Sequence, residues 1–191
     1  MEQAYGTVIN TPEITSIPEG KQLYSRNTKQ DGNGTDCYVG KNFEIAGNVT
    51  LYPIFKTQTF AITYDANEGS GTVPSPQSKE YDVAASILDA AASLTKAGYE
   101  AFYACNTEKD GKGTIYFASD NYDRNEDIIL YAVFSKALKQ GDVTRLGVDE
   151  NGVFKWDNQI YTSVANMAFR DTQNLKKIII PNTVKSIGFW S

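Results

Sequence analysis

An internal repeat constrains this 191-residue chain more than any other feature of its sequence. Asp31–Thr35 (DGNGT) is similar to Asp110–Thr114 (DGKGT), and Leu51–Phe55 (LYPIF) is similar to Leu130–Phe134 (LYAVF). Both pairs have the same offset, because 110 − 31 and 130 − 51 equal 79, and no gap is needed between them. Turn glycines and apolar strand residues that recur in step predict two modules built in the same way.

The second copy predicts a small α+β unit that is mostly β. Phe60–Tyr64 alternates with the period of a strand, and Ala101–Ala104 and Ile128–Phe134 supply closing strands. Between them, apolar residues recur at helical spacing and predict a helix that ends near Gly98; they are Val83, Ile87, Leu88, Ala91 and Leu94. A short helix packed across a small mixed sheet is a β-grasp-like arrangement.

The first copy lacks a counterpart of the opening strand Phe60–Tyr64. Its first apolar run, Tyr5–Ile9, lies roughly where the residues after that strand lie in the second copy. We therefore expect residues 1–56 to form a partial, N-terminally truncated β-grasp-like repeat. Residues 57–135 are expected to form a complete one.

Several motifs of the second copy occur in the order of a known family. They include Thr63–Asn67 (TYDAN), Gly69–Thr72 (GSGT), Gly98-Tyr99, the Asp110–Thr114 turn and Leu130–Phe134. This series resembles the internalin B-type repeat, also called the Listeria–Bacteroides repeat. The resemblance implies β-grasp modules strung along secreted proteins of the bacterial cell surface.

A different pattern begins after residue 135. Residues 135–141 are interpreted as a polar connector, and Val143–Trp156, with Asn151-Gly152 at its turn, is predicted to be a hairpin cap. Ser163–Asn166 and Ser186–Phe189 are similar and 23 residues apart. The string Leu175–Gly188 (LKKIIIPNTVKSIG) resembles the BspA-type leucine-rich repeat, so residues 136–191 are expected to be a hairpin cap plus a truncated leucine-rich-repeat solenoid.

Composition excludes several classes of function. The net charge is −5 and no Lys/Arg-rich block is present, which argues against nucleic-acid binding. The absence of histidine removes Ser/His and Cys/His nucleophile pairs and the usual zinc sites. No segment approaches the roughly 18 apolar residues of a membrane helix, so membrane insertion of this segment is not expected.

Metal and thiol sites are weighed against structural interpretations. Asp31–Asp36 suggests calcium, but Asp36 stands where an EF-hand needs glycine and Asn42 where it needs glutamate, so a structural turn is favoured. The same holds for the cluster of Asp65, Asn67 and Glu68. Cys37 and Cys105 fit no metal spacing and are not repeat equivalents, so a disulfide between them is not expected. No cofactor is predicted.

Aromatic residues supply the candidate ligand contacts. Tyr24, Tyr52, Tyr103 and Tyr131 recur with the repeat and are explained by packing, as listed in the sequence frame above. Tyr38, Tyr116, Phe117 and Tyr122 could instead form an exposed stacking platform for a sugar or a protein.

The sequence predicts a non-catalytic segment of a secreted bacterial cell-surface protein. Its small modules would act as spacer or adhesion units, and its leucine-rich-repeat region would bind an extracellular protein or glycan. The alternative is a carbohydrate-binding accessory module of a secreted enzyme. A hydrolase would need an acid pair in a cleft, and no such pair stands in a recognisable frame.

Overall fold

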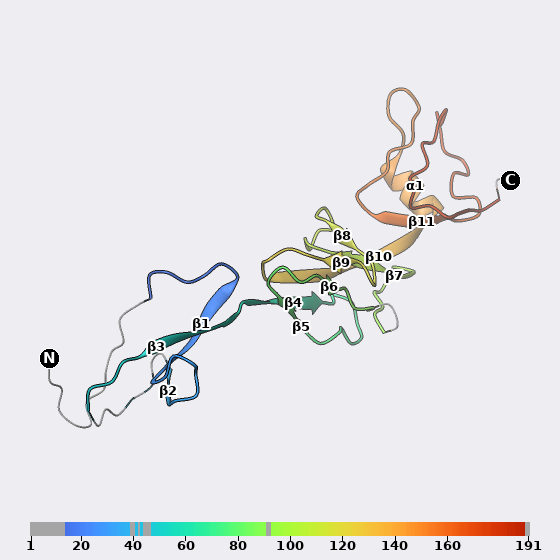
Figure 1. The fold of residues 1–191 in the computed structure, drawn as a ribbon. Helices are drawn as coiled ribbons and strands as arrows, with labels where there is room; N and C mark the ends of the chain where they lie inside the picture. Colours follow the sequence, from blue (N-terminus) through green and yellow to red (C-terminus); the bar gives the residue numbers. More distant parts are fainter. Residues whose placement is uncertain (1–13, 39–40, 42, 44–46, 91–92, 190–191) are drawn as a thin grey trace. The chain divides into compact units, whose positions relative to one another are not determined.

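The computed structural model describes residues 14–38, 41, 43, 47–90 and 93–189. Tyr5–Ile9 and Ala91, which enter two of the predictions above, lie outside this part. The described chain is mostly β, with twelve strands and one helix (Figure 1). Contacts divide the chain into two compact units, which are described separately. Residues 1–60, 78–84 and 123–126 form the first, and residues 61–77, 85–122 and 127–191 form the second.

The first unit contains a three-stranded antiparallel sheet with the order β2-β1-β3. Its strands are β1 (Lys21–Asn27), β2 (Asp36–Cys37) and β3 (Tyr52–Thr57). The loop segment that follows β5 packs on this unit, because the ring of Tyr81 lies against Gly20 and its hydroxyl donates to Glu19 Oε1 at 2.8 Å. Alternating strand residues therefore receive partners from a segment about 60 residues later in the chain.

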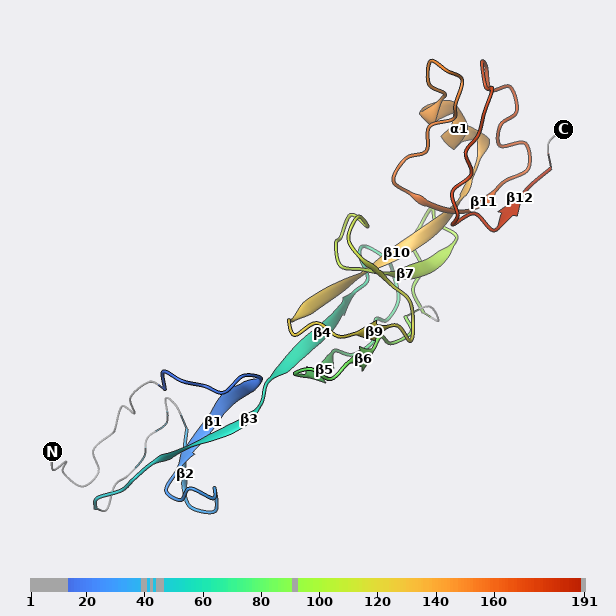
Figure 2. The same ribbon diagram turned by 45° about the horizontal axis from the view of Figure 1, so that its top comes forward.

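The second unit is organised around β10 (Ile128–Leu138), the longest strand (Figure 2). This strand runs parallel to β4 (Thr59–Asp65) and to β11 (Ile160–Val164), and antiparallel to β7 (Ala101–Asn106). The remaining elements are β5 (Gln77–Glu80), β6 (Ala85–Ser86), β8 (Ile115–Tyr116), β9 (Asn121–Tyr122), α1 (Gln140–Leu146) and β12 (Ser186–Ile187). The sheet is mixed, as the sequence predicts.

The two copies share one strand register. Asn27 faces Tyr52 and Arg26 faces Pro53 in the first copy, and their equivalents 79 residues later face each other in the same way. A bulge interrupts β1 between Leu23 and Ser25, and a bulge interrupts the second copy at the equivalent place on β7. An identical irregularity is stronger evidence than identical strands, since bulges are specific features of a fold. The predicted internal repeat is confirmed.

A buried asparagine holds the repeated turn in each copy. The Asn27 side chain donates to Gly32 O at 3.0 Å and accepts from Lys29 N at 2.9 Å; Asn106 makes the equivalent bonds to Gly111 O at 3.1 Å and from Glu108 N at 2.8 Å. Both asparagines are fully buried. A side chain that satisfies backbone groups in this way replaces a regular ladder and fixes the loop.

The core of the second unit is built on alternate residues of β10. Leu130, Ala132, Phe134 and Leu138 are all buried. The first three pack within the repeat, whereas Leu138 packs with a C-terminal cluster that contains Val143, Phe154, Tyr161, Val164, Ala168 and Phe169. One strand therefore supplies side chains to both cores. The segment 135–138 belongs to this strand, so the interpretation of residues 135–141 as a polar connector is wrong.

The helix predicted between residues 83 and 94 is absent from the described residues. Ala85–Ser86 instead pair antiparallel with β9. Ile87 and Leu94 are both buried, but they enter two different clusters, which an extended chain can reach and a single helix face cannot. Val83, by contrast, is 55% exposed. The apolar spacing arose from two separate core contacts, and the β-grasp-like helix is therefore not part of this fold.

The predicted hairpin at Val143–Trp156 is right only at its turn. Asp149 N donates to Val153 O at 2.9 Å, and Val148 pairs antiparallel with Phe154 around Gly152, which has a φ of 79°. Val143 and its neighbours form α1 instead, with Val143 buried in the C-terminal core. Asp142 accepts from the backbone N–H of Lys139, which closes the first turn of the helix and explains the change.

The spacing of 23 residues appears in the structure as parallel strand pairing. Ser163 faces Ser186 and Val164 faces Ile187 between β11 and β12, and Leu138 on β10 faces Val164. Only one pair of strands has this spacing, and β12 is two residues long. A leucine-rich-repeat solenoid is not shown by this arrangement.

Candidate functional site

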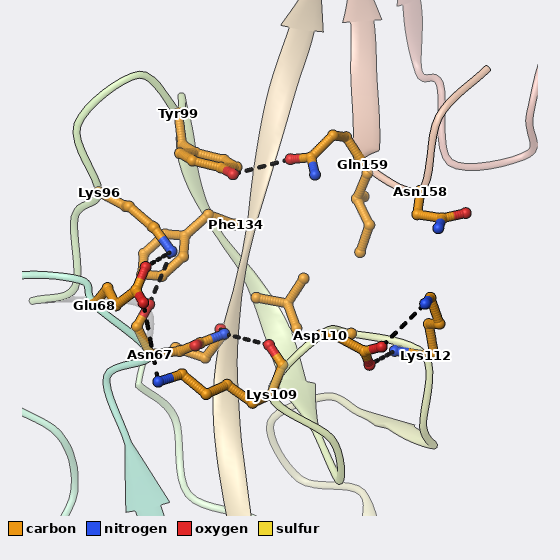
Figure 3. Close-up of a pocket in the computed structure, with 14 residues that line it drawn as sticks. Asn67, Glu68, Lys96, Tyr99, Lys109, Asp110, Lys112, Phe134, Asn158 and Gln159 are labelled. Atoms are coloured by element: carbon orange, nitrogen blue, oxygen red, sulfur yellow. Dashed lines mark hydrogen bonds and ion pairs between the residues drawn. The ribbon is translucent and has the colours of Figure 1, made fainter. Parts of the chain in front are cut away.

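A polar hollow of about 580 Å³ lies in the second unit, where the two turns of the repeat meet the loop before β11. It is lined by residues 67–68, 96, 99, 109–112, 132–134 and 158–160 (Figure 3). Backbone and aromatic side chains of β10 form part of the lining, and charged and amide side chains from the loops surround it. This polar hollow is the candidate functional site.

The first turn places Asn67 and Glu68 at the hollow through an unusual backbone. Both residues have positive φ angles, 49° and 66°. Asp65 Oδ1 accepts from Asn67 N at 2.7 Å, and the Asn67 side chain donates to the carbonyl oxygens of Lys109 and Ala132, each at 2.9 Å. These bonds connect the first turn, the second turn and β10, so Asn67 fixes the geometry of the site.

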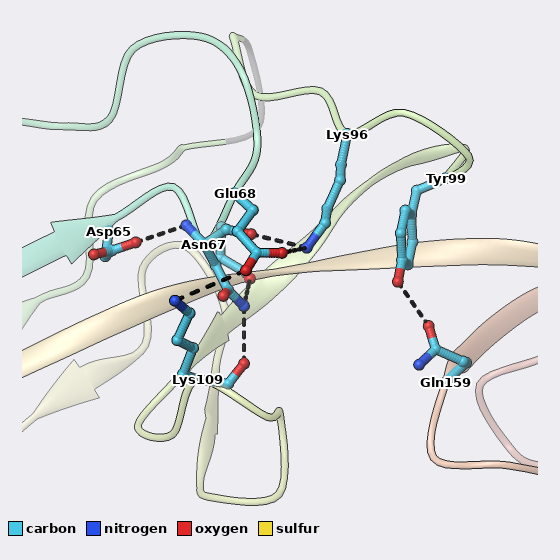
Figure 4. A network of polar contacts seen from close by, with 8 residues as sticks. Asp65, Asn67, Glu68, Lys96, Tyr99, Lys109 and Gln159 are labelled. Atoms are coloured by element: carbon cyan, nitrogen blue, oxygen red, sulfur yellow. Dashed lines mark hydrogen bonds and ion pairs between the residues drawn. The ribbon is translucent and has the colours of Figure 1, made fainter.

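Charges of both signs alternate around the hollow (Figure 4). The Glu68 carboxylate lies between Lys96 Nζ at 3.4 Å and Lys109 Nζ at 3.9 Å, and Lys112 Nζ lies 3.1 Å from Asp110 Oδ2. The pKa of Asp110 is lowered, chiefly by the backbone N–H of Lys112. The Glu68 side chain is 70% exposed, and exposed ion pairs of this kind contribute little to stability. The hollow therefore presents lysine ammonium groups that a ligand could engage.

Aromatic rings and amides complete the lining. Tyr99 and Phe134 are packed with ring centroids 6.0 Å apart, and the Tyr99 hydroxyl donates to Gln159 Oε1 at 2.9 Å. Figure 3 shows that this bond joins the repeat to the loop before β11, with Asn158 beside it. Aromatic faces, amides and charged groups around one hollow can bind a polar ligand such as a sugar or a peptide.

The lysines of the hollow are specific to the second copy. The positions 79 residues earlier than Lys96, Lys109 and Lys112 are occupied by uncharged Ile17, Gln30 and Asn33. Sequence reasoning missed this site. Its signal was available, because cations differ between two copies whose turn glycines are the same.

The structure does not bring the predicted ligand-contact residues together. Tyr122 is fully buried, where it packs edge to face on Tyr116 with centroids 5.8 Å apart, and it is therefore a core residue and not a stacking surface. Phe117 is 46% exposed and packs on Tyr103. Tyr38 is 42% exposed and belongs to the first unit. Ligand contact by Tyr38, Tyr116 and Phe117 stays a prediction.

The acidic turns and the thiols have structural roles. Asp31 Oδ1 accepts from Asn33 N at 3.0 Å, and no group of three metal-ligating side chains is found among the described residues. Cys37 and Cys105 are buried free thiols. Burial, together with the charge of Asp89, raises the pKa of Cys105 to about 11, which keeps it protonated and unreactive at neutral pH.

No helix in the described part of the chain has the length and apolar character that crossing a membrane requires. The chain is similar to a protein of Evansella cellulosilytica named "Putative membrane protein", with 29% identity over 134 residues. That alignment covers 69% of this chain but 19% of the relative, so the chain spans less than a fifth of the relative's length. No solved structure matches the chain.

The comparison with protein families agrees with the repeat seen in the sheet register. It matches residues 60–133 to the Listeria-Bacteroides repeat domain and provides no evidence for a leucine-rich-repeat region. The match begins on β4 and ends on β10, the two parallel strands of the repeat. Residues 60–133 are therefore a Listeria-Bacteroides repeat domain, a repeat typical of bacterial surface proteins.

Proposed function

We propose that this chain is a non-catalytic segment of an exported bacterial cell-surface protein, in which repeat modules act as spacers and present a binding region. The observation that carries the proposal is the Listeria-Bacteroides repeat domain at residues 60–133, preceded by a copy with the same strand register and bulge. A repeated module without a shared reactive cluster suits a spacer.

Surface exposure tests this proposal directly. Intact cells that express the natural full-length protein are treated with protease, and peptides of residues 14–189 are sought in the supernatant. Release of these peptides from intact cells, without release of a cytosolic marker, is the expected result. Recovery of the peptides only after lysis would contradict the proposal.

The finer proposal for residues 136–191 is that they begin a leucine-rich-repeat solenoid. Its support is a ladder of apolar residues in parallel register: Leu138 and Val164 are buried, and Ile187, the last rung, is 52% exposed. In a longer chain, a further coil would cover Ile187. An experimental structure of such a chain with no strand beside β12 would contradict this part.

A carbohydrate-binding module is the second candidate, and the polar hollow favours it. Aromatic rings, amides and lysines line one open space, a combination that binds acidic or polar sugars. A glycan array separates the two candidates. Lys112→Ala should abolish or weaken binding, whereas Asn33→Ala, the equivalent change in the first copy, should leave it unchanged. Equal binding by both variants and the parent chain would exclude the hollow.

A further inference from the structure

A lysine is buried in this protein without a counter-ion. Lys79, on β5, is 1% exposed. Its Nζ donates to Asn125 Oδ1 at 2.9 Å and to the Glu80 backbone oxygen at 3.0 Å, and it lies 5.6 Å from the centroid of the Phe60 ring. Within the described residues, no carboxylate lies within ion-pair distance of it. Burial of an ammonium among neutral partners is costly, so conversion to a neutral group would stabilise this site.

The side-chain amide of Asn125 is held at both ends by Asp82. The Asp82 backbone N–H donates to Asn125 Oδ1 at 2.9 Å, and Asn125 Nδ2 donates to Asp82 Oδ1 at 2.6 Å. Asp82 adopts a φ of 55°, a left-handed conformation that non-glycine residues seldom adopt. This backbone conformation lets one residue contact the amide with both its N–H and its carboxylate.

These contacts supply every group that an acyl transfer requires. Lys79 provides the amine nucleophile, Asn125 Cγ is the electrophile, and the Asp82 N–H is placed to stabilise the oxyanion that develops on Oδ1. The Asp82 carboxylate lies on the nitrogen that must leave. A hydrogen-bond network with only a structural role would not need a carboxylate at that position.

We propose that Lys79 and Asn125 form an intramolecular isopeptide bond, with Asp82 as the proton carrier. The Lys79 ammonium gives up one proton to the Asp82 carboxylate, and the free amine attacks Asn125 Cγ. The tetrahedral intermediate collapses as Asp82 returns its proton to Nδ2. The Nζ–Cγ bond forms, the Cγ–Nδ2 bond breaks, and ammonia leaves as ammonium with the second amine proton. Charge is conserved, and no oxidant or cofactor takes part.

The bond would join β5 to the loop before β10 and close a ring between positions 46 residues apart. Residues 80–124, most of the repeat domain, would then lie outside the covalent path between the two ends of the chain. Tension along the chain would pass through the bond and leave those residues unextended. This inference stands independently of the proposed function, because it depends only on the chemistry of three side chains.

Mass spectrometry of the purified, denatured chain tests the proposal. The expected mass is that of the sequence less one ammonia, and tryptic digestion should yield a branched peptide that contains both residue 79 and residue 125. Cleavage after Lys79 should be lost, while cleavage after Lys96 should be normal. Lys96 is the matched control, since it is also partly buried and hydrogen-bonded to a backbone oxygen, but it has no asparagine side chain as a partner.

Variants separate this reaction from other losses of ammonia. Lys79→Arg should restore the full mass, whereas a cyclic imide formed at Asn125 alone would persist in that variant and would give only linear peptides. Asp82→Asn keeps the size of the side chain and should leave most of the protein unlinked. Full mass together with normal cleavage after Lys79 in the parent chain, after prolonged incubation of folded protein, would overturn the proposal. A bond that forms fully in Asp82→Asn would overturn the role of Asp82.

Discussion

The buried asparagine of the repeated turn allows a quantitative test of the fold. Asn106→Ala removes three hydrogen bonds, to the carbonyl oxygens of Gly111 (3.1 Å) and Gly113 (3.2 Å) and from the N–H of Glu108 (2.8 Å). Each bond contributes about 1 kcal/mol. Water can reach part of this turn, because both glycines are half-buried. We therefore expect a loss of about 2–3 kcal/mol in the free energy of unfolding.

Urea denaturation followed by circular dichroism measures this loss. Asn33→Ala, on the exposed part of the equivalent turn in the first copy, is the matched control and should change stability by less than about 0.5 kcal/mol. Asn27→Ala should resemble Asn106→Ala, because the two asparagines are equivalent. Because the chain has two units, each transition is fitted separately. A loss below about 1 kcal/mol for Asn106→Ala would refute the claim that the asparagine organises the turn.

Three further predictions concern backbone, register and charge. Gly71→Ala should destabilise the second unit by more than about 1 kcal/mol in thermal unfolding, since Gly71 has a φ of 120° and its added Cβ would overlap a backbone carbonyl oxygen; an unchanged melting temperature would contradict this. Tyr116→Cys should form a disulfide with Cys105 on oxidation, because the two positions face each other in antiparallel register; free thiols in a labelling assay would show a different register. Burial acts to raise the pKa of Asp157, but the hydrogen bonds from Arg145 and a backbone N–H lower it overall, so this contact stabilises the fold above about pH 4 and is lost as the pH falls through the lowered value. The stability difference between the parent chain and Arg145→Ala should therefore disappear in acid, and a difference that is constant with pH would contradict the assignment.

The repeat could be predicted because its signals are local. Glycine and asparagine at fixed places in a turn restrict the backbone directly, so the equivalence of Asp31–Thr35 and Asp110–Thr114 carried through to strand register and bulge. The 23-residue spacing likewise predicted which residues of β11 and β12 face each other. In both cases the pattern concerned positions along the chain and not the identity of distant partners.

The missed features depend on distant partners. Apolar residues between positions 83 and 94 fitted a helical period, but Ile87 and Leu94 serve two separate clusters that only the folded sheet defines. The polar hollow combines turns with a loop more than 40 residues further along the chain, and no spacing rule connects them. Tyr122 looked available for stacking because aromatic residues suit both cores and binding surfaces. Burial decides between these roles, and it is a property of the whole fold.

The length of β10 has a consequence for how the protein can be divided. A single strand of 11 residues begins beside β4, continues beside β7 and ends beside β11. The repeat and the C-terminal region therefore share a structural beam, and no hinge separates them. Cleavage at residue 135 would leave each half with a raw strand end and an open core, so the two regions should be inherited, expressed and unfolded as one piece.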